Sequence, residues 1–352
     1  MPRPRYYLLT HYILPARYKR RFFIFNRMNR YLSFLFSLLL ISQLSFGAAP
    51  AQAKKWAVVK TPSCILRLNP DYESSCESQC LMGTVVQIKD SLRYWRQVDA
   101  PDYKNCWTND LVLVYMSEAQ KDDYIKAPKW ICTATHSAVF SSADPDSQKL
   151  SPLEAGCILR RPESCRTLTK GNFVAVLLPD GTQGWVNKSD VEEFESWASG
   201  CTPSAEAIVE RAKSFLGAPY FWGGCTAERF DCSGLVKFCY MLGGGLVLPR
   251  NAREQIHCGR KVPFRLEQMQ SGDLIFFGTL DSAGKVKSVT HVALYIGDGR
   301  IIHSSQLVRI NSLLKGREDY YERQVVGVRR ILGCTQEGEK PVYRASEHPW
   351  YY

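Results

Sequence analysis

The first 53 residues of this 352-residue chain contain no aspartate or glutamate. They do contain eight basic residues, so only +3 of the net charge of +11 belongs to the rest of the chain. The basic character is therefore mostly a property of the N-terminal segment. It gives no reason to expect nucleic acid as a partner of the folded part.

The chain also lacks a comfortable membrane span near its N-terminus. The apolar run at residues 33–46 is shorter than the roughly 20 residues that a spanning helix needs. Basic residues precede it and the sequence GAAPAQA follows it, which is typical of a secretory signal. We expect residues 1–53 to be a leader that is cleaved after Ala53, with Met28 as a possible start, and a retained anchor is the alternative. The mature protein should be periplasmic or secreted, without stable membrane insertion.

The thirteen cysteines show no spacing typical of a metal site. Cys76 and Cys80 resemble half of one, but no His or Cys pair follows at a metal-ligand spacing, so we expect no metal and no cofactor. Export would permit disulfides, although a sequence does not determine their connectivity. Cys157 and Cys165 flank a probable turn and are the best local candidates for a pair.

Two segments after the leader share an order of features. Residues 54–118 and 128–197 each contain short apolar strands broken by turns, and each has a late tryptophan, Trp107 or Trp185. Such a repeat predicts two all-β modules of about 60 residues, each a small barrel. One irregular β domain is the alternative. The polar residues between the segments indicate a linker.

The pattern changes after a second junction at residues 193–203. AEAIVERAKSFLG has helical spacing that ends at Gly217, and residues 231–242 also look helical. DLIFF, HVALYIG and RIIHSS follow as predicted strands. Helices before strands predict an α+β domain over residues 203–334, with a tail at 335–352.

Cys232 stands at the predicted start of the second helix, in the sequence DCSG. Asp231 before it is a good N-cap residue. A thiol in the first turn of a helix lies at the positive end of the helix dipole, which favours the nucleophilic thiolate. A structural or disulfide-bonded cysteine is the alternative for this position.

Two histidines are expected to share one face of a hairpin. His291 opens the strand THVALYIG, and His303 lies in the next strand, after the turn Gly297-Asp298-Gly299. A three-residue loop would pair Ala293 with His303, which makes the two histidines diagonal neighbours. A two-residue loop would move His303 to the opposite face.

Residues 206–333 resemble the NlpC/P60 cysteine peptidases. The motifs AKSFLGAPYFWGG, DCSG, LPRNAREQ, GDLIFF and THVALYIGDGRIIHSS occur in the order found in that family. The preceding segments, GTQGWV above all, resemble bacterial SH3 (SH3b) domains. The combination is similar to peptidases of the dipeptidyl-peptidase VI type. These are γ-D-glutamyl-L-diamino acid endopeptidases. It implies a papain-like catalytic domain behind two SH3b barrels.

The resemblance also implies roles for individual residues. Cys232 matches the nucleophile, His291 the base and His303 the residue that orients the base. Tyr220 matches a tyrosine beside the nucleophile that helps to hold the substrate or the oxyanion. Three further positions match residues that line the pocket or contact the peptide, namely Asp231, Ser233 and Arg250.

In this family the first SH3b module closes the substrate pocket and binds the free amine of L-alanine. Glu73, Glu77 and Tyr103 are the candidates here, and solvated turn residues are the alternative for each. The expected substrate is a peptidoglycan-derived peptide, the cleaved bond joins γ-D-glutamate to the diamino acid, and the expected state is a monomer. The alternatives are an endopeptidase acting on intact wall, a related amidase or acyltransferase, and a non-catalytic binding protein.

Overall fold

The computed structural model of the chain describes residues 55–163 and 168–351. The predicted leader at residues 1–53 and Cys165 lie outside these residues, and so does the expected pairing of Cys157 with Cys165. The cysteines at described positions are free thiols. Within the same residues, no helix is long and apolar enough to cross a membrane.

Residues 56–116 form an antiparallel sheet in the order β3-β2-β6-β5-β4-β1-β7. Alternating side chains of its strands, such as Cys64 and Leu66, are buried in the core of the module. The hydrogen-bonded order runs from β3 to β7 without closing, so the structure supports the predicted β module but not a closed barrel. The strands are β1 (Trp56–Val59), β2 (Ser63–Arg67), β3 (Cys76–Leu81), β4 (Val85–Leu92), β5 (Trp95–Asp99), β6 (Cys106–Asn109) and β7 (Leu113–Met116).

The described part of residues 129–193 forms a second sheet in the order β10-β9-β14-β13-β11-β8-β15, with β12 paired to β13. Its path also stays open. The strands are β8 (Lys129–Cys132), β9 (His136–Phe140), β10 (Lys149–Glu154), β11 (Ile158–Arg160), β12 (Thr169–Lys170), β13 (Phe173–Leu177), β14 (Gln183–Asn187) and β15 (Val191–Glu193).

The two sheets repeat one local structure around their late tryptophans. Trp107 lies in β6, and Asn109 then caps the 3₁₀ turn η1 (Asp110–Val112) before β7 begins. Trp185 lies in β14, and Asn187 caps η2 (Lys188–Asp190) before β15. In both turns the asparagine side chain accepts a hydrogen bond from the residue two positions later. This shared geometry agrees with the predicted internal repeat.

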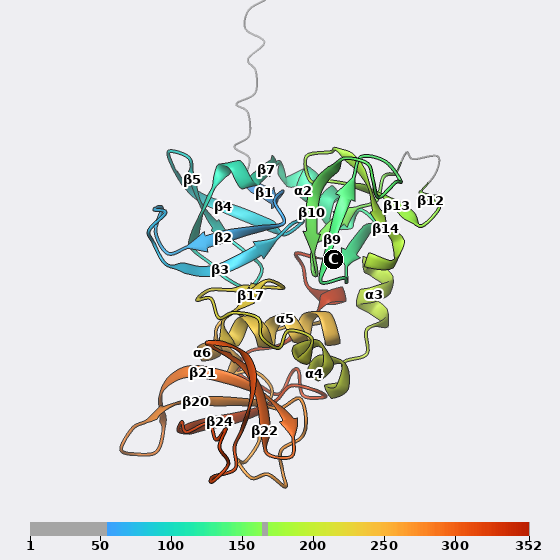
Figure 1. Cartoon of the computed structure of the whole chain (residues 1–352). Helices are drawn as coiled ribbons and strands as arrows, with labels where there is room; N and C mark the ends of the chain where they lie inside the picture. The colour runs from blue at the N-terminus through green and yellow to red at the C-terminus, as the bar shows by residue number, and fades with distance from the viewer. Residues whose placement is uncertain (1–54, 164–167, 352) are drawn as a thin grey trace, which may run out of the picture. The chain divides into compact units, whose positions relative to one another are not determined.

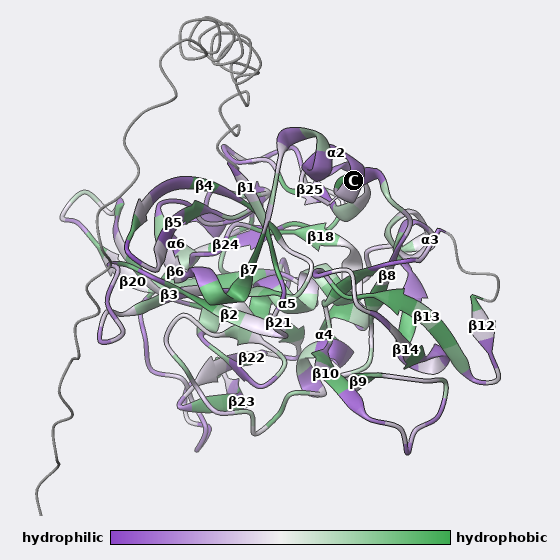
Figure 2. Cartoon of the chain, turned by 90° about the horizontal axis from the view of Figure 1, so that it is seen from above, coloured by the Kyte–Doolittle hydropathy of each residue, from purple (hydrophilic) through white to green (hydrophobic). Residues whose placement is uncertain are grey.

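Both junctions between the modules are helical. Helix α2 (Glu118–Lys126) starts with a capping box in which Ser117 and Gln120 each bond the other's backbone N–H. Helix α3 (Phe194–Gly200) buries Phe194 and Trp197. Figure 2 shows α2 as mainly hydrophilic. The capping box, rather than hydrophobic periodicity, explains why a polar linker becomes a helix.

The remaining residues combine helices with a six-stranded sheet in the order β19-β24-β20-β21-β22-β23 (Figure 1). The helices are α4 (Ala205–Lys213), α5 (Cys232–Gly244) and α6 (Ala252–Gln255). The sheet strands are β19 (Arg260–Lys261), β20 (Leu274–Leu280), β21 (Val286–Gly297), β22 (Arg300–Ser305), β23 (Leu307–Ser312) and β24 (Val325–Arg330). Two short pairs are β16 (Cys225–Thr226) with β17 (Arg229–Phe230), and β18 (Leu246–Val247) with β25 (Tyr343–Arg344), before the 3₁₀ turn η3 (Ala345–Glu347).

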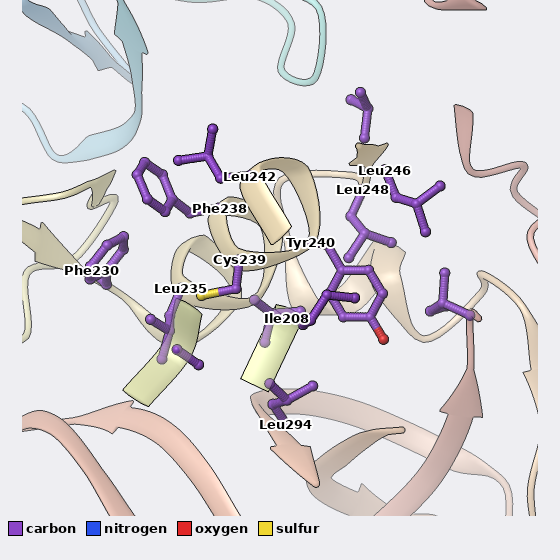
Figure 3. Close-up of a cluster of buried hydrophobic side chains, with 14 of the residues drawn as sticks. Ile208, Phe230, Leu235, Phe238, Cys239, Tyr240, Leu242, Leu246, Leu248 and Leu294 are labelled. Atoms are coloured by element: carbon purple, nitrogen blue, oxygen red, sulfur yellow. The ribbon is translucent and has the colours of Figure 1, made fainter. Parts of the chain in front are cut away.

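Helix α5 is the centre of this domain. The predicted inward residues are all buried, namely Leu235, Phe238, Cys239 and Leu242. Figure 3 shows these residues of α5 in one buried cluster with Ile208 of α4 and Leu294 of β21. The first predicted helix is shorter than expected. It ends at Lys213, and Leu216 beyond it is 49% exposed.

The first sheet makes direct polar contacts with the α5 region. Lys237 of α5 forms an ion pair of 3.1 Å with Asp102. The backbone N–H of Cys225 donates to Oε1 of Gln79 on β3 at 3.1 Å. Because both contacts are buried or nearly so, β3 and the loop at Asp102 help to fix the position of the start of α5.

Gly234 lets the start of α5 approach the preceding turn. A Cβ atom at this position would lie 2.0 Å from the carbonyl oxygen of Gly224, which is backbone and has little freedom to move. The glycine of DCSG is therefore required by packing.

We expect Gly234→Ala to lower the free energy of unfolding by about 1–3 kcal/mol or more, because the methyl group overpacks a rigid contact. Gly200→Ala is the matched control, since no atom lies within 4 Å of its added Cβ. Urea unfolding of both variants makes the comparison. Equal stabilities would contradict the packing requirement.

Candidate active site

Asp231 organises the first turn of α5. Its Oδ1 accepts hydrogen bonds from the backbone N–H of Gly234 at 2.7 Å and from the hydroxyl of Ser233 at 3.1 Å. Its Oδ2 accepts from the N–H of Gly223 at 3.0 Å. The N-cap prediction is confirmed, and Cys232 becomes the first helical residue, only 9% exposed.

Arg250 forms a buried ion pair with the same carboxylate. Its Nη2 lies 2.6 Å from Oδ2 of Asp231, and its Nη1 donates to Oδ1 of Asp231 and to the hydroxyl of Ser233, both at 3.1 Å. Its Nε donates to the hydroxyl of Ser78, on β3 of the first sheet, at 3.1 Å. The side chain is 0% exposed. One arginine thus connects β3 to the start of α5.

These contacts revise two of the predicted substrate contacts. Every nitrogen of the Arg250 guanidinium bonds a protein atom, so no donor remains for a peptide. Both oxygens of Asp231 likewise accept hydrogen bonds from protein atoms, and its charge is paired with that of Arg250. We therefore interpret Asp231 and Arg250 as supports for the nucleophile's turn. The hydroxyl of Ser233 is held within the same network.

The two predicted histidines meet on one face of the β21–β22 hairpin. Leu294 pairs with Ile302, which sets the register in which Ala293 lies opposite His303. His291 Nε2 lies 2.7 Å from His303 Nδ1, and the ring centroids are 4.9 Å apart. Strand β21 runs to Gly297 and β22 begins at Arg300, so the loop consists of Asp298 and Gly299, which both have positive φ as in a type I′ turn. The predicted three-residue loop is therefore wrong, but a bulge between Tyr295 and Gly297 shifts the register and keeps the two histidines on one face, as predicted.

The histidine pair continues into residues that sequence reasoning did not select. His303 Nε2 lies 2.9 Å from Oδ1 of Asn311, and Arg309 Nε donates to the same oxygen at 2.9 Å. The ring of Tyr321 packs edge-on against His303, with 4.5 Å between centroids. Asn311 lies outside the motifs quoted above, and only the pairing of β22 with β23 brings it to the histidines.

Burial keeps the thiol and the histidines neutral. Burial, followed by the charge of Asp231, raises the pKa of Cys232 to about 11, although the backbone N–H groups of Val292 and Ser233 and the charge of Arg250 oppose this. Burial also lowers the pKa of His291 to about 3 and that of His303 to about 4. The helix dipole, which was expected to favour the thiolate, is thus opposed by desolvation of the sulfur, the larger of the two effects here. The contact with Val292 places the thiol next to His291 in the sheet.

Tyr220 also lies near the thiol. Its backbone N–H donates to the carbonyl of Gln306 at 2.9 Å, and the residue forms an isolated bridge with Phe230. Burial first, and then the proximity of Cys232, raises the pKa of its phenol to about 12. The hydroxyl is therefore a protonated hydrogen-bond donor near the sulfur.

The structure distinguishes among the three candidate substrate contacts of the first sheet, which are Glu73, Glu77 and Tyr103. The hydroxyl of Tyr103 donates to Oε2 of Glu77 at 3.0 Å, and Asn251, next to Arg250, also hydrogen-bonds this tyrosine. Among the described residues Glu77 makes no ion pair, since its other oxygen accepts only from Ser75. Glu73 is exposed in a turn where its backbone N–H bonds Asp71. Glu77 and Tyr103 thus adjoin the site, and no contact brings Glu73 to it.

Comparison with known proteins agrees with this geometry. Residues 217–330 match the model of the NlpC/P60 family. A γ-D-glutamyl-L-lysine dipeptidyl-peptidase of Bacillus cereus is 32% identical over 266 residues, which cover 73% of this chain and 75% of that protein. Dipeptidyl-peptidase 6 of Lysinibacillus sphaericus is 30% identical over 270 residues, covering 73% and 91% respectively.

A solved structure has the same arrangement over most of the chain. The crystal structure of an NlpC/P60 family protein from Bacillus cereus matches with a TM-score of 0.65 at 25% identity. The match covers 79% of this chain and 99% of the other. The similarity therefore includes residues ahead of the catalytic domain.

Because burial lowers the pKa values of the histidines, we expect the free energy of unfolding to decrease in acid. An unfolded histidine binds a proton near pH 6.5, whereas buried His303 binds one only near pH 4, so the unfolded state takes up more protons between these values. The contribution of neutral His303 to the free energy of unfolding is fully present above pH 6.5. It is lost as the pH falls toward 4, at roughly 1.4 kcal/mol per pH unit.

Urea unfolding between pH 4.5 and 6.5 measures this slope. In His303→Leu the free energy of unfolding should depend less on pH, by about the slope of one histidine. A variant with an unchanged slope would show that His303 is not held neutral.

Proposed function

The chain belongs to the NlpC/P60 family, and from this premise we propose that it is a cysteine peptidase acting on cell-wall peptides. The proposed bond joins the side-chain carboxyl of D-glutamate to the diamino acid. The observation that carries the proposal is the buried hydrogen bond of 2.7 Å between His291 and His303, beside the thiol of Cys232. Such a Cys–His–polar arrangement serves nucleophilic catalysis on a carbonyl.

The proposed reaction starts from a neutral Cys232 thiol and a neutral His291 imidazole. As the sulfur of Cys232 attacks the carbonyl carbon, its proton passes to the ring nitrogen of His291 that His303 does not use. The tetrahedral oxyanion receives hydrogen bonds from the N–H of Cys232, which has no intrahelical partner in the first turn of α5, and from the hydroxyl of Tyr220. His291 then protonates the leaving amine, leaving an acyl-enzyme. Water hydrolyses the thioester and returns the proton to the sulfur.

A free L-alanine amine is the proposed recognition feature of the substrate. Glu77 has no cationic partner among the described residues, and Tyr103 holds it beside Asn251. An ammonium group would complete this site with a charge-assisted hydrogen bond, which is about twice as strong as a neutral one. A peptide still joined to glycan through that nitrogen has no such charge, so released fragments are the proposed substrates.

We propose the predicted organisation for the rest of the chain. Residues 54–118 and 128–197 are SH3b-like modules, an assignment that the repeated asparagine-capped turns support. Residues 203–334 are the catalytic domain, and the tail at 335–352 packs through β25. Wall peptides as substrates are consistent with export of a monomer.

Cys232→Ser should lose nearly all hydrolysis, because serine has no accessible anion near neutral pH. His291→Ala should lower kcat by about 10²–10⁴-fold through loss of proton transfer. His303→Ala should cost less, because the base remains although poorly held. Release of L-Ala-D-Glu, followed by mass spectrometry, measures each rate. Substantial activity in the serine variant would overturn the assignment of the nucleophile.

Recognition of the amine is tested with L-Ala-γ-D-Glu-L-Lys and its N-acetylated form. The wild-type protein should cleave the free peptide far faster, and Glu77→Gln should raise KM for it and reduce the discrimination. Glu73→Gln removes the same charge from an exposed turn nearby and should change neither value, which makes it the matched control. Equal cleavage of both peptides, or efficient digestion of intact wall, would favour a remodelling endopeptidase.

A further inference from the structure

We infer that Asn311 is a positioning residue of this active site, because it fixes which nitrogen of each histidine carries a hydrogen. The inference rests on the proposed roles of Cys232 and His291. Asn311 lies on β23 opposite Ile301 of β22, and it is 6% exposed. Its side chain bonds His303, Arg309 and Asp319, so its effect on the thiol passes through His303.

Two contacts determine how the amide of Asn311 is oriented. Its Nδ2 donates to the backbone carbonyl of Asp319 at 2.7 Å, and its Oδ1 accepts from Nε of Arg309 at 2.9 Å. The reverse orientation would place an NH₂ group against the donor of Arg309 and an oxygen against the carbonyl of Asp319. Oδ1 therefore faces His303, and a carbonyl oxygen can only accept a hydrogen bond.

The tautomers of both histidines follow from this acceptor. His303 Nε2, 2.9 Å from Oδ1 of Asn311, must carry a hydrogen. In a neutral ring Nδ1 of His303 is then unprotonated, so His291 Nε2, 2.7 Å away, must be the donor between them. A neutral His291 is thereby left with an unprotonated Nδ1. This nitrogen is the one that His303 does not use and the one proposed to receive the proton of the thiol.

Without the acceptor oxygen of Asn311, both histidines could adopt the opposite tautomers. If His303 carried its hydrogen on Nδ1, it would donate to His291 Nε2. His291 would then carry its own hydrogen on Nδ1 and could not accept one from the thiol. The two rings change together because one hydrogen bond joins them. Asn311 thus serves the Cys–His–His set as an orienting carboxylate serves a serine-protease histidine, where the wrong tautomer is known to abolish most of the activity.

Nitrogen NMR of protein labelled with ¹⁵N-histidine tests the inference without a substrate, because it identifies the protonated nitrogen of each ring. In the wild type, His291 and His303 should both carry hydrogen on Nε2. In Asn311→Leu both should shift toward Nδ1–H. Asn311→Asp keeps an oxygen acceptor and should retain the wild-type tautomers. Signals are assigned from the His291→Ala and His303→Ala variants.

Kinetics provide the second readout. Asn311→Leu should lower kcat by about 10–100-fold, less than loss of the base itself, while KM stays near its wild-type value. Asn311→Asp should recover much of the loss. Asn187→Leu removes a capping amide from η2 in the second sheet and serves as a control for general destabilisation. If the leucine variant does not fold, Asn311→Ala makes the same removal with a smaller side chain.

Each outcome has a definite meaning. Wild-type tautomers in the variant without an acceptor would overturn the inference, and so would a loss of kcat no larger than that of Asn187→Leu. A wild-type protein that hydrolyses no wall peptide would instead refute the proposed function. It would leave the tautomer measurement interpretable.

Discussion

The buried ion pair between Asp231 and Arg250 is the contact on which the site depends. Asp231 caps α5 and holds the turn at Gly223, while Arg250 connects the same carboxylate to Ser78 in the first sheet. A charge buried this deeply needs its partner, since loss of one member leaves the other desolvated and unpaired. The position of Cys232 at the start of α5 therefore depends on one carboxylate and one guanidinium, which also join it to β3.

The histidine side of the site has a different construction. It is built on paired strands, where the register of β21, β22 and β23 places His291, His303 and Asn311 in a row. Strand register fixes such a row firmly, because a slip of one residue would move every side chain to the other face. The thiol comes from a helix and its proposed base from a sheet, and the contact of Cys232 with Val292, next to His291 in the chain, brings the two elements together. Chemistry of this kind needs both elements to be rigid.

Much of this was predictable from local patterns. The helix that follows Asp231, its buried face and the hairpin around Asp298 all depend on neighbouring residues and were predicted, whereas the bulge that sets the loop length was not. Contacts between distant segments were beyond such reasoning. Nothing in the sequence around Arg250 indicates that Ser78, 172 positions away, occupies its Nε, so the network that holds Asp231 and Arg250 could not be predicted. The effect of burial on the pKa of Cys232 was equally out of reach, because burial depends on the whole fold whereas the helix dipole is visible locally.

The neutral resting state of the thiol has a consequence outside catalysis. Oxidants such as peroxides react with thiolates much faster than with thiols, so a cysteine with a raised pKa resists conversion to sulfenic acid. A thiol buried beside a neutral imidazole is therefore oxidised more slowly than an exposed thiolate would be. The burial that keeps Cys232 protonated in the absence of a substrate is thus expected also to protect its sulfur from oxidants.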